Sequence, residues 1–337
     1  MEEKSRLKWV DILKSFGIFA VAFGHIYRQE NVLCWLYTFH VPLFFIAGGI
    51  VFRPSEILRN IKRRAFRILV PYAVFGVLMA LYFSLIEYRW RDISMSLPDC
   101  LLGLVIGDMD HLEFHSHLWF LPCYFLTAVA YNALYRLLRP LGCRLVCAGA
   151  CVVYMLFPLP SLPWGADRAL GFLGLFALGN LAAEKGLLNR AEKLLAPVQL
   201  GAAVLLLGLS VGLAAMYLTR GLMWAVCAIV GTAGFMSLSM ALEKLRIPAE
   251  IMSGAGRGTL VALCIHGPIY RILLKLAAMA SGSTTDILRM NVFSSLAVTA
   301  VTLVICLGVF RLLERFLPWC IGIVPAKKEK RPPENGS

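Results

Sequence analysis

The sequence predicts an all-α, polytopic integral membrane protein. Of its 337 residues, 59% are hydrophobic and 16% are charged, whereas soluble globular domains have roughly 25% charged residues. Long apolar segments recur along the chain, and about 20 apolar residues suffice to cross a bilayer as a helix. The net charge of +13 comes largely from basic residues that lie between these segments. That pattern is typical of membrane topology, and we expect no nucleic-acid partner.

The apolar segments predict about ten transmembrane helices. They cover residues 9–27, 33–52, 68–88, 118–138, 144–159, 168–184, 195–217, 222–241, 258–278 and 292–316. Lys and Arg are concentrated in alternate loops, which predicts that both termini are cytoplasmic. The charged N-terminus leads directly into the first span, so we expect no cleavable signal peptide.

One membrane domain is predicted over residues 8–316, followed by a charged, Pro-rich, disordered cytoplasmic tail over residues 325–337. The longest stretch outside the spans runs from Arg89 to His117, and we expect its semi-apolar piece, Leu97–Ile106, at the membrane interface. The ten cysteines form no Cys-x-x-Cys pair, and most fall in apolar runs. They are therefore predicted to be small buried hydrophobic residues.

The first span, WVDILKSFGIFAVAFGH, carries Asp11, Lys14 and His25. At about 100° per residue, Lys14 and His25 differ by roughly 20° around the helix axis and lie roughly 16 Å apart along it. Asp11 falls on the same stripe. Charged side chains are costly in lipid, so we expect this face to line a cavity.

Two interpretations are open for each of these polar residues. A neutral imidazole can accept and return a proton near neutral pH, which makes His25 a candidate general base. The alternative is an interfacial histidine among lipid headgroups. Asp11 and Lys14 are spaced to pair, so they form either a structural pair with a snorkelling lysine or a site where Lys14 neutralises an anionic cofactor from the cytoplasm.

His40 and His266 each lie inside an apolar segment, two residues before a proline. Pro42 predicts a kink in the second span, and Gly48–Gly49 permits close helix packing. The two His-x-Pro pairs suggest polar side chains that face a shared interior. The alternative is that each buried histidine makes a single interhelical hydrogen bond.

The basic run KRRAFRILVPY leads into the third span. It serves as a positive-inside anchor whatever else it does. Arg64 and Arg67 are one turn apart, beside Arg63, and guanidinium groups bind phosphate in a forked geometry. These three arginines are therefore candidates to bind a diphosphate-bearing cofactor at the cytoplasmic side.

The outer loop GDMDHLEFHSHLWFLP is rich in side chains that could bind a metal. They are Asp108, Asp110, His111, Glu113, His115 and His117. Their spacing matches neither a His-Glu-x-x-His motif nor a zinc finger. We expect no metal here, and contact with an acceptor or a simple solvated loop is favoured. Arg168, near the outer end of the sixth span, is a candidate to bind an anionic acceptor group.

Taken in order, these segments resemble the membrane acyltransferase-3 family, and within it the fucose 4-O-acetylase-like branch. The opening is similar to that branch's Asp-x-x-Lys-x10-His first helix, and FHVPLFFIAGG resembles the family's second helix, with Ala47 where Ser is common. KRRAFRILVPY, HLWFLPCYF, GFLGLFALGNL and IHGPI resemble later blocks. The resemblance runs from about residue 8 to 316.

The resemblance implies transfer of an acyl group, usually acetyl from acetyl-CoA, to a carbohydrate hydroxyl. The CoA diphosphate would meet Lys14, Arg64 and Arg67, with the pantetheine arm running along the first helix. His25 would then deprotonate the acceptor hydroxyl. His40 or His266 would polarise the thioester carbonyl or orient His25.

The implied partners are acyl-CoA, a carbohydrate or glycolipid acceptor and membrane lipid, with a bacterial inner membrane as the expected location. A transporter or flippase is the main alternative, because intramembrane histidines on a polar stripe also suit a proton-coupled carrier. A third interpretation is a sensor or scaffold whose chemistry is lost. The intact Asp11, Lys14, His25 and His40 argue against the third.

Overall fold

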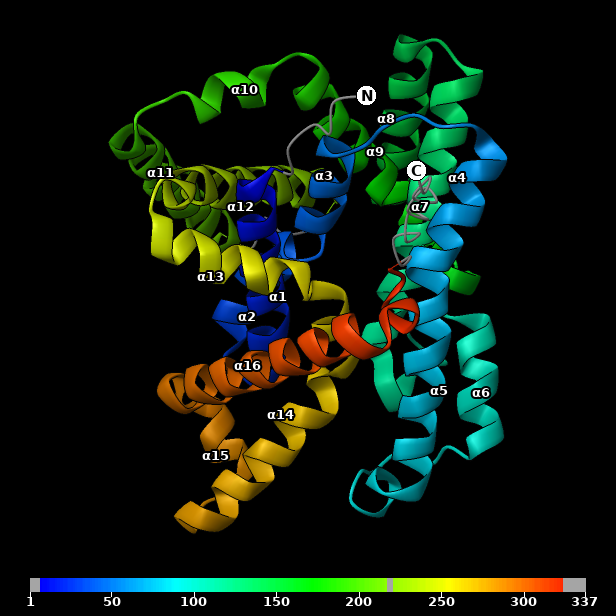
Figure 1. Cartoon of the computed structure of the whole chain (residues 1–337), viewed down its shortest axis with the longest axis vertical. Helices are drawn as coiled ribbons and strands as arrows, with labels where there is room; N and C mark the ends of the chain where they lie inside the picture. Colours follow the sequence, from blue (N-terminus) through cyan, green and yellow to red (C-terminus); the bar gives the residue numbers. More distant parts are fainter. Residues whose placement is uncertain (1–6, 217–220, 324–337) are drawn as a thin grey trace, which may run out of the picture.

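The computed structural model describes residues 7–216 and 221–323, and within them the chain forms helices and no strand (Figure 1). The predicted disordered tail over residues 325–337 lies outside the described residues. The main helices are α1 (Lys8–Ile26), α2 (Glu30–Phe39), α3 (Pro42–Ile50), α4 (Ile57–Arg64), α5 (Val70–Leu85), α7 (Phe120–Leu137), α8 (Pro140–Leu156), α9 (Ala166–Glu184), α11 (Ala196–Ala215), α12 (Gly221–Glu243), α14 (Thr259–Ser281) and α16 (Val292–Phe316). The shorter helices are α6 (Leu97–Ile106), α10 (Leu187–Glu192), α13 (Arg246–Arg257) and α15 (Thr285–Met290).

Several short segments join these helices. A π-helical turn over Ala65–Leu69 connects α4 to α5, and a 3-10 segment over Glu113–Trp119 leads into α7. The other 3-10 turns are Glu87–Arg89, Pro163–Gly165 and Pro318–Ile321.

The chain is a multi-pass membrane protein. Among the described residues, eight helical segments are long and apolar enough to cross a bilayer. The other two predicted spans, residues 144–159 and 168–184, correspond to α8 and α9. Helix α8 has 17 residues, and α9 carries Asp167 and Arg168 in its first turn and ends at Glu184, which makes it less apolar. The predicted count of about ten is therefore not confirmed.

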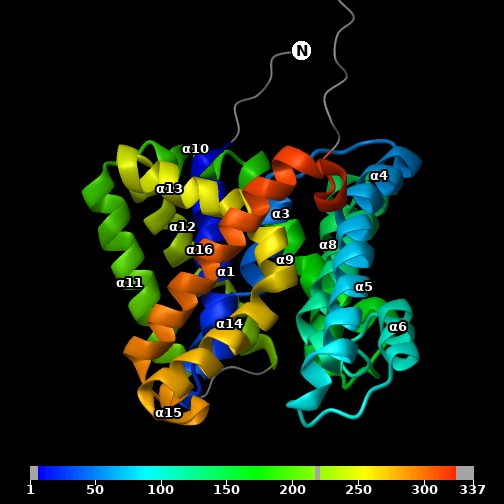
Figure 2. The same ribbon diagram turned by 60° about the horizontal axis from the view of Figure 1, so that its bottom comes forward.

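Helix α1 forms the centre of the bundle. It packs against α2, α3, α12, α13, α14 and α16, and 78% of its apolar window is buried, compared with 22% for α11. Figure 2 shows α4, α10 and α13 at the end of the molecule where α1 begins, and α6 and α15 at the opposite end. The semi-apolar piece predicted between the third and fourth spans forms α6, which packs against α5.

The second predicted span is interrupted before its proline, as the sequence predicts. Helix α2 ends at Phe39 and α3 begins at Pro42. Past this break, α3 approaches α9 closely, because a Cβ atom at Gly49 would lie 2.0 Å from the Phe176 carbonyl oxygen. A Cβ atom at Gly179 would lie 2.2 Å from the Ile46 carbonyl oxygen. The close packing expected at Gly48–Gly49 is therefore confirmed.

The cysteines also behave as predicted. Nine of the ten are buried, and Cys34 is partly buried. They act as small apolar side chains in the helix contacts.

Candidate active site

One face of α1 lines a cavity of about 640 Å³, as the spacing of its polar residues predicts. Lys14, Ile18, Val21 and His25 follow one another along this wall at helical spacing. Aromatic side chains from other helices complete much of the lining: Tyr37, Phe44, Trp119, Phe120, Tyr124, Tyr154, Phe172 and Trp224. The cavity is thus mostly apolar and has a lysine at one end and a histidine toward the other.

Asp11 and Lys14 form the predicted pair at the beginning of α1. The Lys14 Nζ atom lies 3.4 Å from Oδ1 of Asp11, which is buried. Backbone of α13 covers this turn, since a Cβ atom at Gly256 would lie 1.8 Å from the Asp11 carbonyl oxygen. The next residue, Arg257, lines the same cavity as Lys14. No motif in the sequence pointed to Arg257, and the close approach at Gly256 is what brings it to the cavity.

His40 lies at the break between α2 and α3 and lines the cavity. Its Nδ1 donates a hydrogen bond to the Leu36 carbonyl at 2.8 Å, so the neutral ring keeps a lone pair on Nε2. Its ring centroid lies 5.0 Å from that of Tyr37. The alternative interpretation expected an interhelical hydrogen bond, but the acceptor is on the histidine's own helix.

His266, in α14, also bonds through Nδ1 to carbonyls of its own helix. Its Nδ1 donates to the carbonyls of Ala262 and Leu263 at 2.8 and 3.0 Å. The Nε2 atom is buried and finds no hydrogen-bond partner among the described residues. A backbone bond at Nδ1 fixes the tautomer, so Nε2 of the neutral ring is the acceptor that faces the site.

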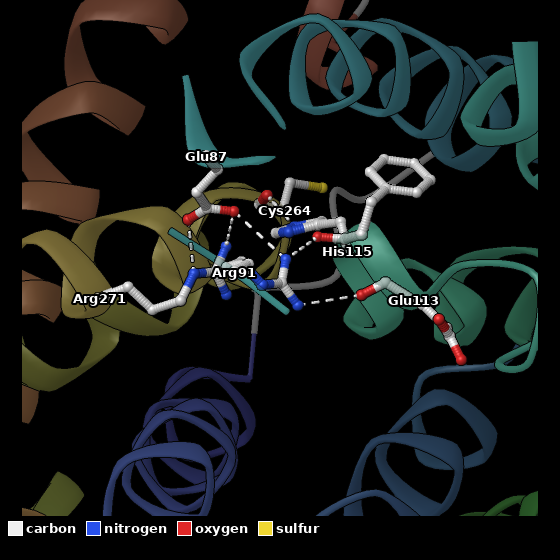
Figure 3. Close-up of polar contacts among 7 residues, drawn as sticks. Glu87, Arg91, Glu113, His115, Cys264 and Arg271 are labelled. Atoms are coloured by element: carbon white, nitrogen blue, oxygen red, sulfur yellow. Dashed lines mark hydrogen bonds and ion pairs between the residues drawn. The ribbon is translucent and has the colours of Figure 1, made fainter. Parts of the chain in front are cut away.

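The proline of the second His-x-Pro pair positions another histidine. Pro268 has no N–H group, so the carbonyl of Cys264 loses its helical partner. The Nε2 atom of His115 donates to this carbonyl at 2.7 Å (Figure 3). Room for the ring comes from Gly267, where a Cβ atom would lie 3.0 Å from Cε1 of His115.

His117, which the sequence assigned to an outer loop that contacts the acceptor or is simply solvated, lies beside His25 and His266. Its ring centroid lies 4.0 Å from that of His25 and 4.4 Å from that of His266. Both of its ring nitrogens are buried and have no hydrogen-bond partner among the described residues. The solvated-loop interpretation is therefore wrong for His115 and His117, because the segment folds inward onto α14. The only available signal was the adjoining aromatic block HLWFLP, which opens α7.

Two other polar residues of that loop, Asp108 and His111, pair with each other. Asp108 is buried and accepts hydrogen bonds from the backbone N–H and the Nδ1 atom of His111, at 2.8 and 2.7 Å. The His111 side chain itself is half exposed. Arg168 lines the main cavity, with its guanidinium 4.9 Å from the Trp119 ring centroid.

His25, His117 and His266 are the residues that could hold a metal. Each offers one ring nitrogen, and these nitrogens all lie within 4.8 Å of one another. Three imidazoles are a known ligand set for zinc. Among the described residues, however, the group contains no carboxylate, and positively charged Arg271 lines a cavity with His25. The expectation of no metal stays a prediction.

The three arginines predicted to bind phosphate do not share one site. Arg63 and Arg67 line a surface groove with Arg59 and Lys62. Arg64 is turned toward Asn60, and its Nε donates to Oδ1 of Asn60 at 3.0 Å. The π-helical turn begins at Ala65 and changes the register between the two predicted partners, so Arg64 and Arg67 do not line one groove.

A family model described as an acyltransferase domain matches residues 7–311. The chain belongs to the acyltransferase-3 family. No curated protein gives a significant match.

Proposed function

We propose that this membrane acyltransferase moves an acyl group, most simply acetyl, from acyl-CoA to a hydroxyl of a cell-envelope carbohydrate or glycolipid. The observation that carries the proposal is the position of His25. It lines the apolar cavity that begins at Lys14, and it also lines a second, polar cavity at the other end of α1. A base with access from two cavities can bring together two substrates that arrive separately.

The donor would enter from the Lys14 end, which we take as cytoplasmic. Lys14 and Arg257 would bind the CoA diphosphate. Arg63, Arg64 and Arg67 belong to α4 and the turn after it, and α4 lies at the same end of the molecule, where their positive charge favours an anion. Asp11 would hold the lysine in position. The pantetheine arm would lie among the aromatic side chains along α1, with the thioester near His25.

The reaction would be direct transfer. His25 takes the proton of the acceptor hydroxyl while the hydroxyl oxygen attacks the thioester carbonyl. The new ester C–O bond forms, the C–S bond breaks, and the proton passes from His25 to the leaving thiolate. His40 and His266 orient His25 or polarise the carbonyl, and His117 packs edge-on against the His25 ring. We place the enzyme in a bacterial inner membrane.

The test is label transfer from acetyl-CoA with a radioactive acetyl group, using membranes that contain equal amounts of wild type or His25→Ala. Loss of a general base lowers rates by about 10²–10⁴-fold, so we expect labelled envelope glycan with wild type and almost none with the variant. His111→Ala is the matched control, because His111 lines neither cavity.

Two results would count against this proposal. Equal labelling by wild type and His25→Ala would reject His25 as the base and direct attention to His40 and His266. If wild type transfers no label while an envelope precursor still crosses the membrane, the chain acts as a carrier instead.

A further inference from the structure

The second cavity at His25 is unusually rich in arginine. It has a volume of about 530 Å³ and is lined by His25 together with Arg28, Arg91, Arg271 and Arg289. We call these four arginines and the space that they enclose the arginine vestibule. It lies at the opposite end of α1 from Lys14, so the donor diphosphate does not account for its charge.

A single buried carboxylate organises two of these arginines. Glu87 accepts hydrogen bonds from Arg271 at 2.6 and 2.9 Å and from Arg91 at 3.3 Å (Figure 3). Arg91 also donates to the carbonyls of Phe114 and Glu113, at 2.6 and 3.1 Å. One negative charge therefore faces two guanidinium groups, and the same network fixes the segment that carries His115 and His117.

The other two arginines come from outside this network. Arg289 donates to the carbonyls of His25 and Ile26, both at 2.8 Å, and these carbonyls carry no formal charge. Arg28 lies 3.6 Å from Asp286, and both side chains are largely exposed. Four guanidinium groups thus face two carboxylates, which leaves an excess of positive charge around His25.

Two of the four arginines, Arg289 and Arg91, have a lowered pKa, whereas Glu87 raises the pKa of Arg271. Burial, and then the neighbouring Arg28, lower the pKa of the Arg289 guanidinium. Burial, and then Arg271, lower the pKa of Arg91. Positive charge is disfavoured at these positions, and a bound anion would relieve the repulsion.

We propose that the arginine vestibule binds the acceptor, and that this acceptor is an anionic carbohydrate with a carboxylate or phosphate close to the hydroxyl that is acylated. This inference rests on the acyl transfer proposed above. Guanidinium groups bind carboxylate and phosphate through paired hydrogen bonds. Arg289 lies beside the base, because its Nε and Nη2 groups donate to the carbonyls of Ile26 and His25.

The experiment analyses the labelled product made by wild-type membranes from radioactive acetyl-CoA. The released glycan is passed over an anion exchanger before and after phosphatase treatment, and before and after carbodiimide reduction of carboxylates. We expect the label to be retained, and the treatment that abolishes retention identifies the anion as phosphate or carboxylate. A labelled glycan that is neutral from the start would overturn the inference while leaving acyl transfer intact.

Variants provide the second readout. Arg28→Gln and Arg289→Gln are each expected to lower kcat/KM for the acceptor about tenfold or more without changing KM for acetyl-CoA. Arg89→Gln is the control, because Arg89 is exposed and contacts Tyr88 rather than the vestibule. If both vestibule variants match this control, the inference fails. If wild type yields no His25-dependent label at all, the proposed function fails first.

Discussion

The apolar cavity along α1 and the arginine vestibule both reach His25, yet they are built from opposite kinds of side chain. The first is walled by aliphatic and aromatic residues, with its positive charges carried by Lys14, Arg168 and Arg257. The second has four arginines around a smaller space. The two proposed substrates match this contrast: an apolar arm ending in a thioester on one side, and a charged carbohydrate on the other.

The largest expected effect comes from removing the carboxylate that organises the vestibule. Glu87 is 1% exposed and is bonded to two arginines. Breaking a buried ion pair by deleting one partner costs about 3–5 kcal/mol. We therefore expect Glu87→Ala to lower the thermal unfolding temperature in detergent sharply and to abolish acyl transfer.

The control for this change is Glu56→Ala. Glu56 forms an exposed ion pair with Arg59 at 3.7 Å, and such pairs contribute about 0–1 kcal/mol. Similar unfolding temperatures for the two variants would mean that the Glu87 network does not hold the vestibule together.

Lys14→Met tests the apolar cavity, in which Lys14 is proposed to bind the donor. If Lys14 binds the CoA diphosphate, losing a hydrogen bond to a charged group costs about 1.5–3 kcal/mol, or roughly a ten- to hundredfold rise in KM for acyl-CoA. Lys14→Arg keeps the charge and should retain most activity. Steady-state kinetics with varied acetyl-CoA measure both. A fall in kcat at constant KM would assign Lys14 to another step.

Gly267→Ala tests the close packing of the His115 and Arg271 side chains around Gly267 in α14. The added Cβ atom would lie 3.0 Å from Cε1 of His115 and 3.2 Å from Nη1 of Arg271. Overpacking a well-filled site costs about 1–3 kcal/mol, and we expect acyl transfer to fall several-fold. Gly308→Ala in α16 is the matched control, because open space surrounds its Cβ position. Equal rates for the two variants would show that the ring positions tolerate displacement.

The smallest expected effect is that of metal removal. The cluster of His25, His117 and His266 includes no carboxylate among the residues that the structure describes, and the neighbouring arginines repel a dication. Treatment with 1,10-phenanthroline should leave acyl transfer unchanged. Stoichiometric zinc in the purified protein, with loss of activity on chelation and recovery on zinc addition, would contradict this prediction.

Local patterns in the sequence determined much of this molecule. The stripe of Lys14 and His25 follows from helical periodicity, so their shared cavity could be predicted. Pro42 interrupts its helix because proline lacks an N–H group, and Gly49 allows close packing because it has no side chain. The apolar content and the ordered motifs also indicated a membrane acyltransferase, and the family match confirms it.

Tertiary structure decided which distant residues meet at the site. His117 looked like part of a polar loop, and only the folding of its segment against α14 brings it to His25. In the sequence, Arg257 and Arg289 are indistinguishable from ordinary loop charges. The packing of α13 against α1 brings Arg257 to the apolar cavity, and the bonds of Arg289 to the end of α1 bring it to the vestibule. Periodicity specifies which face a residue occupies within its own helix, whereas contacts between helices depend on how the whole bundle buries its apolar surface and satisfies its polar groups.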